Sequence, residues 1–300
     1  MPIRLMENFR ALFYAPYYAA YALGFYQRAG VEVELLTSDA PGDAIPALLD
    51  GTIDLTWGGP MRVMKARDAD SASPLVCFCE MVARDPFFLI GRRGLRPFEL
   101  SQLRQLRFAS VAEVPTPWLC LQHDLRERGV DPAAVPRIAD RPMARNDAAL
   151  RAGDLDVMQA FEPYASLAES DGAGEVLYAA SDRGPTVYTA FIATRDGVAR
   201  HRDAFRAMTR AVAELQQWLS AGRAEDLAAA AAAYFPGVPA DILVRAFQRY
   251  RAAGVWAGDP AMSKAGFTRL AESLHSGGFI ARLPRYDDCV EQSIAEEAAS

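Results

Sequence analysis

Aromatic and acidic side chains are concentrated in four short stretches that we predict to be loops, residues 9–17, 57–61, 113–118 and 161–164. Flat rings suit stacking on a planar ligand, and carboxylates accept hydrogen bonds from ligand N–H groups. The acids are Glu113 and Glu162. The aromatic residues are Phe9, Phe13, Tyr14, Tyr17, Trp57, Trp118, Phe161 and Tyr164. These residue types predict a binding site for a small flat molecule.

Several of these residues also have an ordinary structural explanation. Any single aromatic residue is as compatible with core packing as with ligand contact, and Glu162 could complement the positive end of a helix that follows it. Arg10 and Arg62 are the basic residues in or beside the loops; we expect surface salt bridges from them, and the alternative is an anion clamp. Gly58 and Gly59 can bring backbone N–H groups close to a ligand. The predicted ligand-binding set is Phe9, Phe13, Tyr17, Trp57, Gly58, Gly59, Glu113, Thr116, Trp118, Glu162 and Tyr188.

Catalytic constellations are absent from the sequence. It contains no nucleophile elbow, no zinc-protease motif and no P-loop, and its three histidines fall in predicted helices away from the loops. Lys65 is the lysine nearest the loops, and a solvated helix lysine explains it better than a Schiff base. Cys77 and Cys79 lack a second pair, so they predict no zinc site. We therefore predict no enzymatic activity, no cofactor and no bound metal.

The elements that must position the loops occur twice. Residues 47–60 and 149–163 both run from a helix end through Gly, a branched apolar residue and Asp into a short apolar run. The two glycines are 153 − 51 = 102 residues apart, and Asp54 and Asp156 have the same separation (156 − 54 = 102). Glycine suits the left-handed position that ends a helix, and the apolar runs have the length of buried strands. The repeat predicts two α/β lobes with the same plan.

Alternating strands and helices predict largely parallel sheets. We expect lobe one to comprise residues 1–90 and 190–300, and lobe two residues 91–189, joined by two crossing strands near 84–91 and 186–194. The helices predicted over 198–300 have no counterpart in the first half, so we expect them to cover lobe one. Ligands of open α/β sheets bind outside the carboxyl ends of the strands, which places the four loops across an interlobe cleft.

Composition excludes several classes of protein. The chain has 300 residues, of which 51% are hydrophobic and 23% charged, as in ordinary globular proteins. A net charge of −6 provides no basic field for nucleic acid. No apolar run reaches the roughly 18 residues of a membrane span. A strand is predicted from Ile3, where a signal peptide would lie, so the chain is expected to be periplasmic if a leader has been removed and cytoplasmic if it is complete as given.

The sequence resembles the substrate-binding proteins of ABC importers in the thiamine-pyrimidine-precursor and aliphatic-sulfonate/nitrate group. The resemblance rests on LGFYQRAGVEV (23–33), LLDGTIDL (48–55) with the following WGGP, FEPYA (161–165) and RYDDCVE (285–291). It implies a type II periplasmic-binding-protein fold, ligand capture by hinge closure, and delivery to an ABC permease with its ATPase subunits. It also implies that Trp57, Glu113, Glu162 and the 9–17 loop form the site. We expect a monomer with a small-molecule ligand and no nucleic-acid partner.

The ligand expected from this resemblance and from the loops is a small planar nitrogen heterocycle like the thiamine pyrimidine precursor. Its faces would stack on Trp57 or Tyr17, and its amino group would donate to Glu113 or Glu162. The sequence departs from pyrimidine binders at FYAPYY (13–18), where those proteins carry an Asn/His-containing stretch. One alternative is therefore a sulfonate- or nitrate-type anion-binding protein.

Two further classes share this fold. A pyrimidine-precursor synthase-like enzyme using pyridoxal phosphate would rely on a histidine and a Cys-rich segment. No histidine lies near the loops, and Cys77-Phe78-Cys79 lies in the wrong half of the chain. The effector domain of a transcription regulator would need an N-terminal helix-turn-helix, where this chain has a predicted strand.

Overall fold

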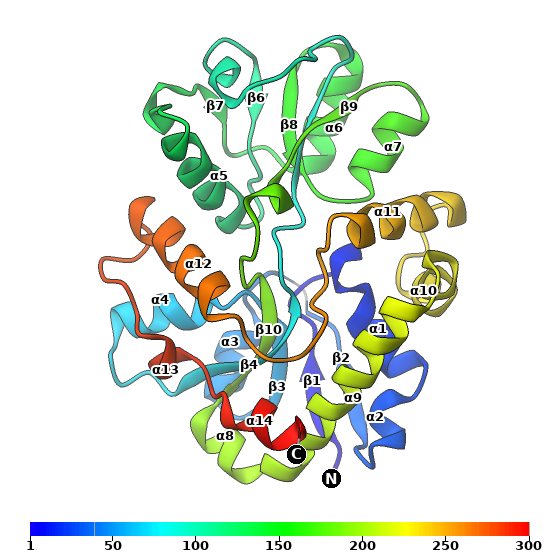
Figure 1. Ribbon diagram of the computed structural model, residues 1–300, viewed down its shortest axis with the longest axis vertical. Coiled ribbons are helices and arrows are strands. Elements are labelled where there is room, and N and C mark those ends of the chain that lie inside the picture. Colours follow the sequence, from blue (N-terminus) through cyan, green and yellow to red (C-terminus); the bar gives the residue numbers. More distant parts are fainter. Residues whose placement is uncertain (39, 300) are drawn as a thin grey trace.

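Two five-stranded sheets form the cores of two lobes, which lie one above the other in Figure 1. The computed structural model describes residues 1–38 and 40–299. The strands are β1 (Ile3–Met6), β2 (Val33–Leu36), β3 (Leu55–Gly58), β4 (Leu75–Val82), β5 (Phe88–Gly91), β6 (Phe108–Ala109), β7 (Arg137–Ile138), β8 (Val157–Ala160), β9 (Glu175–Ala179) and β10 (Thr189–Thr194). Their order is β2-β1-β3-β10-β4 in lobe one and β7-β6-β8-β5-β9 in lobe two.

Each sheet contains one strand that runs against the others, and in each case it is the strand that the chain enters from the other lobe. These strands are β10 in lobe one and β5 in lobe two. The connecting segments, residues 83–87 and 184–188, lie side by side, because Thr186 N–H donates to the Ala83 carbonyl at 2.8 Å and Tyr188 N–H donates to the Val82 carbonyl at 2.8 Å. Residue 90, the expected lobe boundary, lies inside β5 in the second sheet.

The internal repeat is confirmed by matching ion pairs at the start of β3 and of β8. Arg4 donates to the two oxygens of Asp54 at 2.8 and 3.0 Å, and Arg107 donates to those of Asp156 at the same distances. Hydrogen bonds from Arg107 hold the pKa of Asp156 well below its usual range. The glycines that precede these aspartates, Gly51 and Gly153, have left-handed φ values of 79° and 78°. The aspartates thus link corresponding pairs of neighbouring strands, β1 to β3 in lobe one and β6 to β8 in lobe two.

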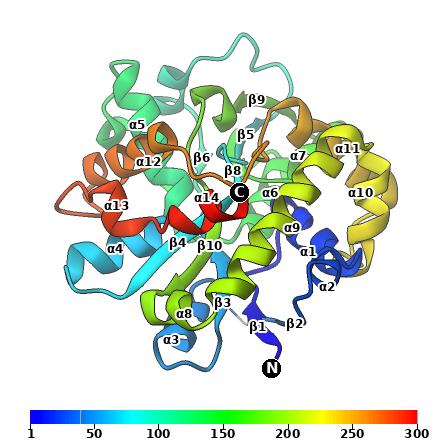
Figure 2. The ribbon, with the colours of Figure 1, turned by 60° about the horizontal axis from the view of Figure 1, so that its bottom comes forward.

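Helices cover both faces of each sheet (Figures 1 and 2). They are α1 (Ala15–Ala22), α2 (Phe25–Arg28), α3 (Ala44–Leu49), α4 (Met61–Ala69), α5 (Thr116–Glu127), α6 (Met143–Ala152), α7 (Tyr164–Ser170), α8 (Arg195–Arg200), α9 (Arg202–Ala221), α10 (Ala224–Ala231), α11 (Ala240–Ala252), α12 (Lys264–Ser276), α13 (Tyr286–Cys289) and α14 (Ser293–Ala299). Within the described residues, no helix has both the length and the apolarity needed to cross a membrane.

The C-terminal helices contact both lobes. Helices α9 and α14 pack together on lobe one, as Figure 2 shows, but α11 packs on α7 and α12 packs on α5, both in lobe two. The helices expected to cover lobe one do contact it, α11 through α10 and α12 through α4, and α11 and α12 also reach lobe two. Two polar contacts fix α11 there: Arg249 Nε donates to Glu162 Oε1 at 2.7 Å, and the Tyr250 hydroxyl accepts from Glu162 N–H at 2.9 Å.

A buried carboxyl group in the core of lobe one predicts a pH-dependent stability. Glu80 in β4 is 2% exposed; Oε2 accepts from Ser263 N–H at 2.9 Å, and Oε1 has no partner among the described residues. Burial raises the pKa of Glu80 to about 7. Because the folded pKa exceeds the unfolded value, the native state binds the extra proton, and stability is lost as the pH rises from about 4.5 to about 7.

Glu80→Gln removes this loss and keeps an oxygen acceptor for Ser263. We expect the variant to exceed the parent protein in free energy of unfolding by roughly 2 kcal/mol at pH 8 and to match it near pH 4. Urea unfolding at the two pH values measures the difference. An equal effect of the substitution at both pH values would show that Glu80 does not change its protonation on unfolding.

Candidate functional site

A cavity of about 30 Å³ lies between the lobes, at the carboxyl ends of strands from both sheets. Its walls come from the loop after β1, the starts of α4 and α5, and the two connecting segments. The lining residues are Asn8, Phe9, Phe13, Tyr14, Gly59, Met61, Arg62, Phe87, Val114, Pro115, Thr116 and Tyr188. Five of the predicted site residues are among them: Phe9, Phe13, Gly59, Thr116 and Tyr188.

Rings form most of the apolar wall. Phe13 contacts Phe9, Phe87 and Tyr188, with ring centroids 6.0, 6.1 and 6.3 Å apart. Gly59 is closely packed: a Cβ there would lie 3.3 Å from Met61 Cγ, so that this side chain would have to shift slightly, and 3.5 Å from a backbone oxygen of the second connecting segment. The loop aromatics near Phe13 thus serve both core packing and the cavity wall.

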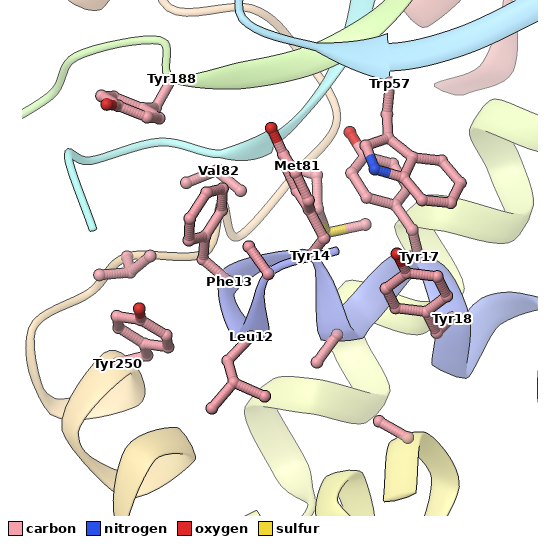
Figure 3. Close-up of a cluster of buried hydrophobic side chains, with 14 of the residues drawn as sticks. Leu12, Phe13, Tyr14, Tyr17, Tyr18, Trp57, Met81, Val82, Tyr188 and Tyr250 are labelled. Atoms are coloured by element: carbon pink, nitrogen blue, oxygen red, sulfur yellow. The ribbon is translucent and has the colours of Figure 1, made fainter. Parts of the chain in front are cut away.

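Trp57 and Tyr17, the rings expected to stack on a ligand, stack on each other instead. Their centroids are 4.8 Å apart with an interplanar angle of 5°, and both side chains are fully buried beneath the cavity wall (Figure 3). Neither lines the cavity. Each ring face is occupied because helix α1 packs with Tyr17 against Trp57 of β3. This contact between the two elements cannot be read from a single sequence.

The two predicted acids also lie outside the cavity lining and bind helix starts. Glu162 is fully buried, accepts from Ser166 N–H at 2.9 Å at the start of α7, and forms its ion pair with Arg249. Glu113 is exposed and accepts from Met143 N–H at 2.8 Å at the start of α6. The helix-end explanation accounts for both carboxylates.

Two further predicted residues lie away from the lining. Trp118 on α5 belongs to the core of lobe two, where its ring faces the Arg137 guanidinium at 4.4 Å. Gly58 ends β3, where a Cβ would lie 3.4 Å from Ile192 Cδ1 and 3.8 Å from Asn8 Cγ. Lys65, on which pyridoxal phosphate chemistry would depend, donates to the Phe279 carbonyl at 2.6 Å and is likewise outside the cavity.

Arg62 is the charged residue of the cavity, and among the described residues nothing pairs with it. Of the described lining residues it alone carries a charge. Burial lowers the pKa of Arg62, which means that the protein holds this cation partly out of water; the negative charge of Asp43 offsets only part of this effect and forms no ion pair with Arg62. The expected surface salt bridge of Arg62 is therefore absent from the described part of the chain, whereas that of Arg10 is confirmed, with Glu7 at 2.8 Å.

Uncharged polar groups stand beside Arg62. Asn8 Nδ2 donates to the Tyr14 hydroxyl at 3.3 Å, and burial raises the pKa of Tyr14 to about 12, so this phenol stays neutral. The Tyr188 hydroxyl has no partner within the described residues. Asn8, Tyr14 and Arg62 are absent from the predicted ligand-binding set. The unpaired state of Arg62 depends on distant residues and carries no local sequence signal.

Two helix amino ends point positive charge at the cavity. Helix α4 begins at Met61 and α5 begins at Thr116, and the residues at both starts line the cavity, one from each lobe. A helix amino end carries unpaired N–H groups and about half a positive charge. Together with Arg62, they give the cavity the electrostatics of an anion site. Among the described residues, no cluster of acidic, histidine and cysteine side chains could hold a metal ion.

Comparison with known proteins finds a family and a relative that match most of the chain. The model of the NMT1-like family matches residues 9–234. The protein YtlA of Bacillus subtilis (strain 168), which carries the provisional name of a binding protein, is 24% identical over 300 residues, covering 99% of this chain and 90% of YtlA.

Solved structures share the fold over nearly the whole chain. A ligand-binding component of an ABC-type import system from Staphylococcus aureus superposes with a TM-score of 0.76 at 18% identity, covering 99% of both chains. The aliphatic sulphonate binding protein SsuA of Escherichia coli gives 0.76 at 16% identity (97% and 92% covered), and the nitrate-binding protein NrtA of Synechocystis PCC 6803 gives 0.71 at 15% (99% and 88%). At these identities the likeness establishes the fold, and the predicted type II periplasmic-binding-protein fold is confirmed.

Proposed function

This chain belongs to the NMT1-like family, and we propose that it is the solute-binding component of an ABC import system that captures a small ligand bearing an anionic oxygen group between its lobes. The observation that carries this proposal is Arg62, a partly buried cation in the interlobe cavity without a carboxylate partner among the described residues. Buried charges are normally paired, so a ligand anion is the natural partner.

The surroundings of Arg62 support a compact oxyanion. The amino ends of α4 and α5 face the same cavity, and no carboxylate is among its lining residues in the described chain. Arginine binds oxyanions through two parallel N–H donors. Phe9, Phe13 and Phe87 offer apolar contact to the rest of the ligand. SsuA and NrtA, which share the fold, are named for sulphonate and nitrate binding, in keeping with this chemistry.

A planar nitrogen heterocycle is the second candidate ligand, and the ring-lined wall favours it. Phe9, Phe13, Phe87 and Tyr188 supply rings on several sides of the cavity. The carboxylates expected to accept from an amino group are engaged elsewhere, so such a ligand would depend on Asn8 and the Tyr188 hydroxyl for its hydrogen bonds. Binding without catalysis follows from either ligand, because the lining offers no nucleophile paired with a base.

A ligand panel distinguishes the two candidates. Methanesulfonate, nitrate and an aminopyrimidine are each added to the purified protein, and the melting temperature is recorded. A true ligand at about 100 times its dissociation constant stabilises the fold by about 2.7 kcal/mol. We expect stabilisation by an oxyanion; stabilisation by the pyrimidine alone would replace the anion proposal with the heterocycle, and sodium chloride at equal ionic strength is the control.

The proposed transport role includes hinge closure, docking of the monomeric binding protein on a permease with its ATPase, and a location outside the cytoplasmic membrane. We propose that the two lobes, expected as residues 1–90 with 190–300 and 91–189, pivot in residues 83–87 and 184–188, so that all of β5 moves with lobe two and all of β10 with lobe one. Contacts across the cavity, such as Phe13 on Phe161 at 5.4 Å, belong to the closed arrangement. A space of about 30 Å³ admits a ligand only after the lobes separate.

Small-angle scattering tests this motion. The radius of gyration should fall when the ligand found in the panel saturates the protein, because two short connecting segments absorb the rotation at little cost. Opening separates Arg249 from Glu162, so Arg249→Met should increase the radius of the unliganded protein. An unchanged radius at saturation would exclude closure as the capture step.

A further inference from the structure

The turn between β2 and α3 lies directly against the Arg62 guanidinium. Gly42 in this turn has a φ of +104°, which L side chains rarely adopt. A Cβ placed on Gly42 would lie 2.6 Å from Arg62 Nη1, 3.3 Å from Cζ and 3.5 Å from Nη2. All three distances are below or near van der Waals contact, so the whole guanidinium occupies the space that a side chain at residue 42 would need.

The same glycine is bonded to the cavity wall. Gly42 N–H donates to Asn8 Oδ1 at 3.2 Å, and Asn8 Nδ2 donates to the Tyr14 hydroxyl at 3.3 Å. The turn itself is closed by Asp43, whose carboxylate accepts from Ala40 N–H at 2.8 Å. The backbone at Gly42 is therefore held in place by a chain of hydrogen bonds that ends at two lining residues.

The guanidinium is directed by its close packing against Gly42, with the charge of Asp43 in the same turn attracting it. Among the described residues Arg62 has no hydrogen-bond or ion-pair partner that would set its orientation, although it lines the cavity. Less conformational entropy is lost on binding when a side chain already has its binding orientation before the ligand arrives. The backbone of Gly42 is the surface that supplies this restraint.

We propose that Gly42 is a positioning residue of the ligand site: because Gly42 has no side chain, the Arg62 guanidinium packs against its backbone, and the N–H donors of Arg62 face the cavity. This inference rests on the proposed anion-binding function of Arg62. It assigns the turn of residues 40–43 to the site, although Gly42 itself does not line the cavity.

Gly42→Ala tests the proposal, with Gly51→Ala as the matched control. Both glycines have positive φ in lobe one, +104° and +79°, but a Cβ at residue 51 meets nothing within 4 Å. Both variants therefore carry backbone strain, and only Gly42→Ala displaces the guanidinium. The Nε–Hε signal of Arg62 in the NMR spectrum of the unliganded protein, assigned by its loss in Arg62→Gln, should shift and become mobile in Gly42→Ala alone.

A second measurement uses methanesulfonate as the probe. Gly42→Ala should weaken its binding about tenfold, and the loss should disappear when Arg62 is already glutamine. An unchanged Nε–Hε signal in Gly42→Ala, or an equal change in Gly51→Ala, would overturn the positioning role. Absence of methanesulfonate binding by the parent protein would count against the proposed function alone, because the NMR result still decides the role of Gly42.

Discussion

Replacing Arg62 with glutamine should lower the affinity for an oxyanion ligand by about 100-fold or more. A hydrogen bond to a charged group contributes about 1.5–3 kcal/mol, and a guanidinium can make two to one oxyanion. A loss of about 2.8 kcal/mol corresponds to a factor of 100 in the dissociation constant. Isothermal titration calorimetry with the stabilising ligand of the panel measures the change.

The stability of the unliganded protein should not fall with the ligand affinity in Arg62→Gln. Burial penalises the charge of Arg62, and the attraction of Asp43 offsets this penalty only in part, because the pKa of Arg62 is still lowered. Removing the charge should therefore leave the melting temperature of the unliganded protein unchanged or higher. A simple packing role for Arg62 predicts a lower melting temperature, so the two measurements together separate ligand anchoring from structural support.

Arg10→Gln is the matched control, because Arg10 is a basic residue of the same loop region outside the cavity. Its partner Glu7 is 3% exposed and would lose its cation, so this variant should be less stable. Its ligand affinity should stay within about twofold of the parent value, because neither Arg10 nor Glu7 lines the cavity. Equal affinities of Arg62→Gln and the parent protein would place the anion anchor elsewhere.

The architecture could be predicted because its signals are local. A glycine that ends a helix, an aspartate three residues later and a short apolar run occur in both halves. In the structure, the aspartate of each copy forms the same Arg–Asp ion pair between neighbouring strands. The helical segment after the aromatic loop is divided into α1 and α2 at Gly24, where the backbone becomes left-handed. The placement of α11 and α12 against lobe two depends on contacts between distant residues, which no local pattern reports.

The site could be predicted only in outline. The aromatic loop after β1, Gly59 and the start of α5 were expected at the cleft from their positions after strands, and Phe9, Phe13 and Thr116 line the cavity. The partners of the charged residues were not predictable. Glu162 pairs with Arg249, 87 positions later, whereas Arg62 pairs with nothing in the described chain. Contacts between residues far apart in the sequence thus decide which charged side chain is free to bind a ligand.

The largest loss of stability is expected from Arg183→Met, because Arg183 neutralises two buried carboxylates next to the connecting segments. Its side chain is 2% exposed, and Asp85 and Asp124 are fully buried. Arg183 Nε donates to Asp124 Oδ1 at 2.9 Å, Nη1 donates to Asp85, and the Tyr178 hydroxyl donates to Asp124 at 2.8 Å. The network joins the first connecting segment to α5.

Methionine preserves the length of the side chain but leaves two buried carboxylates without a cation. Breaking a buried ion pair from one side costs about 3–5 kcal/mol, a large part of the roughly 5–15 kcal/mol that stabilises a typical protein. Urea unfolding should register this loss. Arg151→Met is the matched control, because Arg151 also bridges two acids but is 31% exposed, and its replacement should cost about 1 kcal/mol or less.

The loss in Arg183→Met should depend on pH. Burial already raises the pKa of Asp85 while Arg183 opposes that rise. Without the guanidinium, the folded pKa of Asp85 should rise further above its unfolded value, so the variant should gain stability as the pH falls through it. Its deficit relative to the parent protein should therefore be smaller at pH 5 than at pH 8. A deficit of the same size at both pH values, or one no larger than that of Arg151→Met, would show that Arg183 contributes by packing rather than by neutralising the two aspartates.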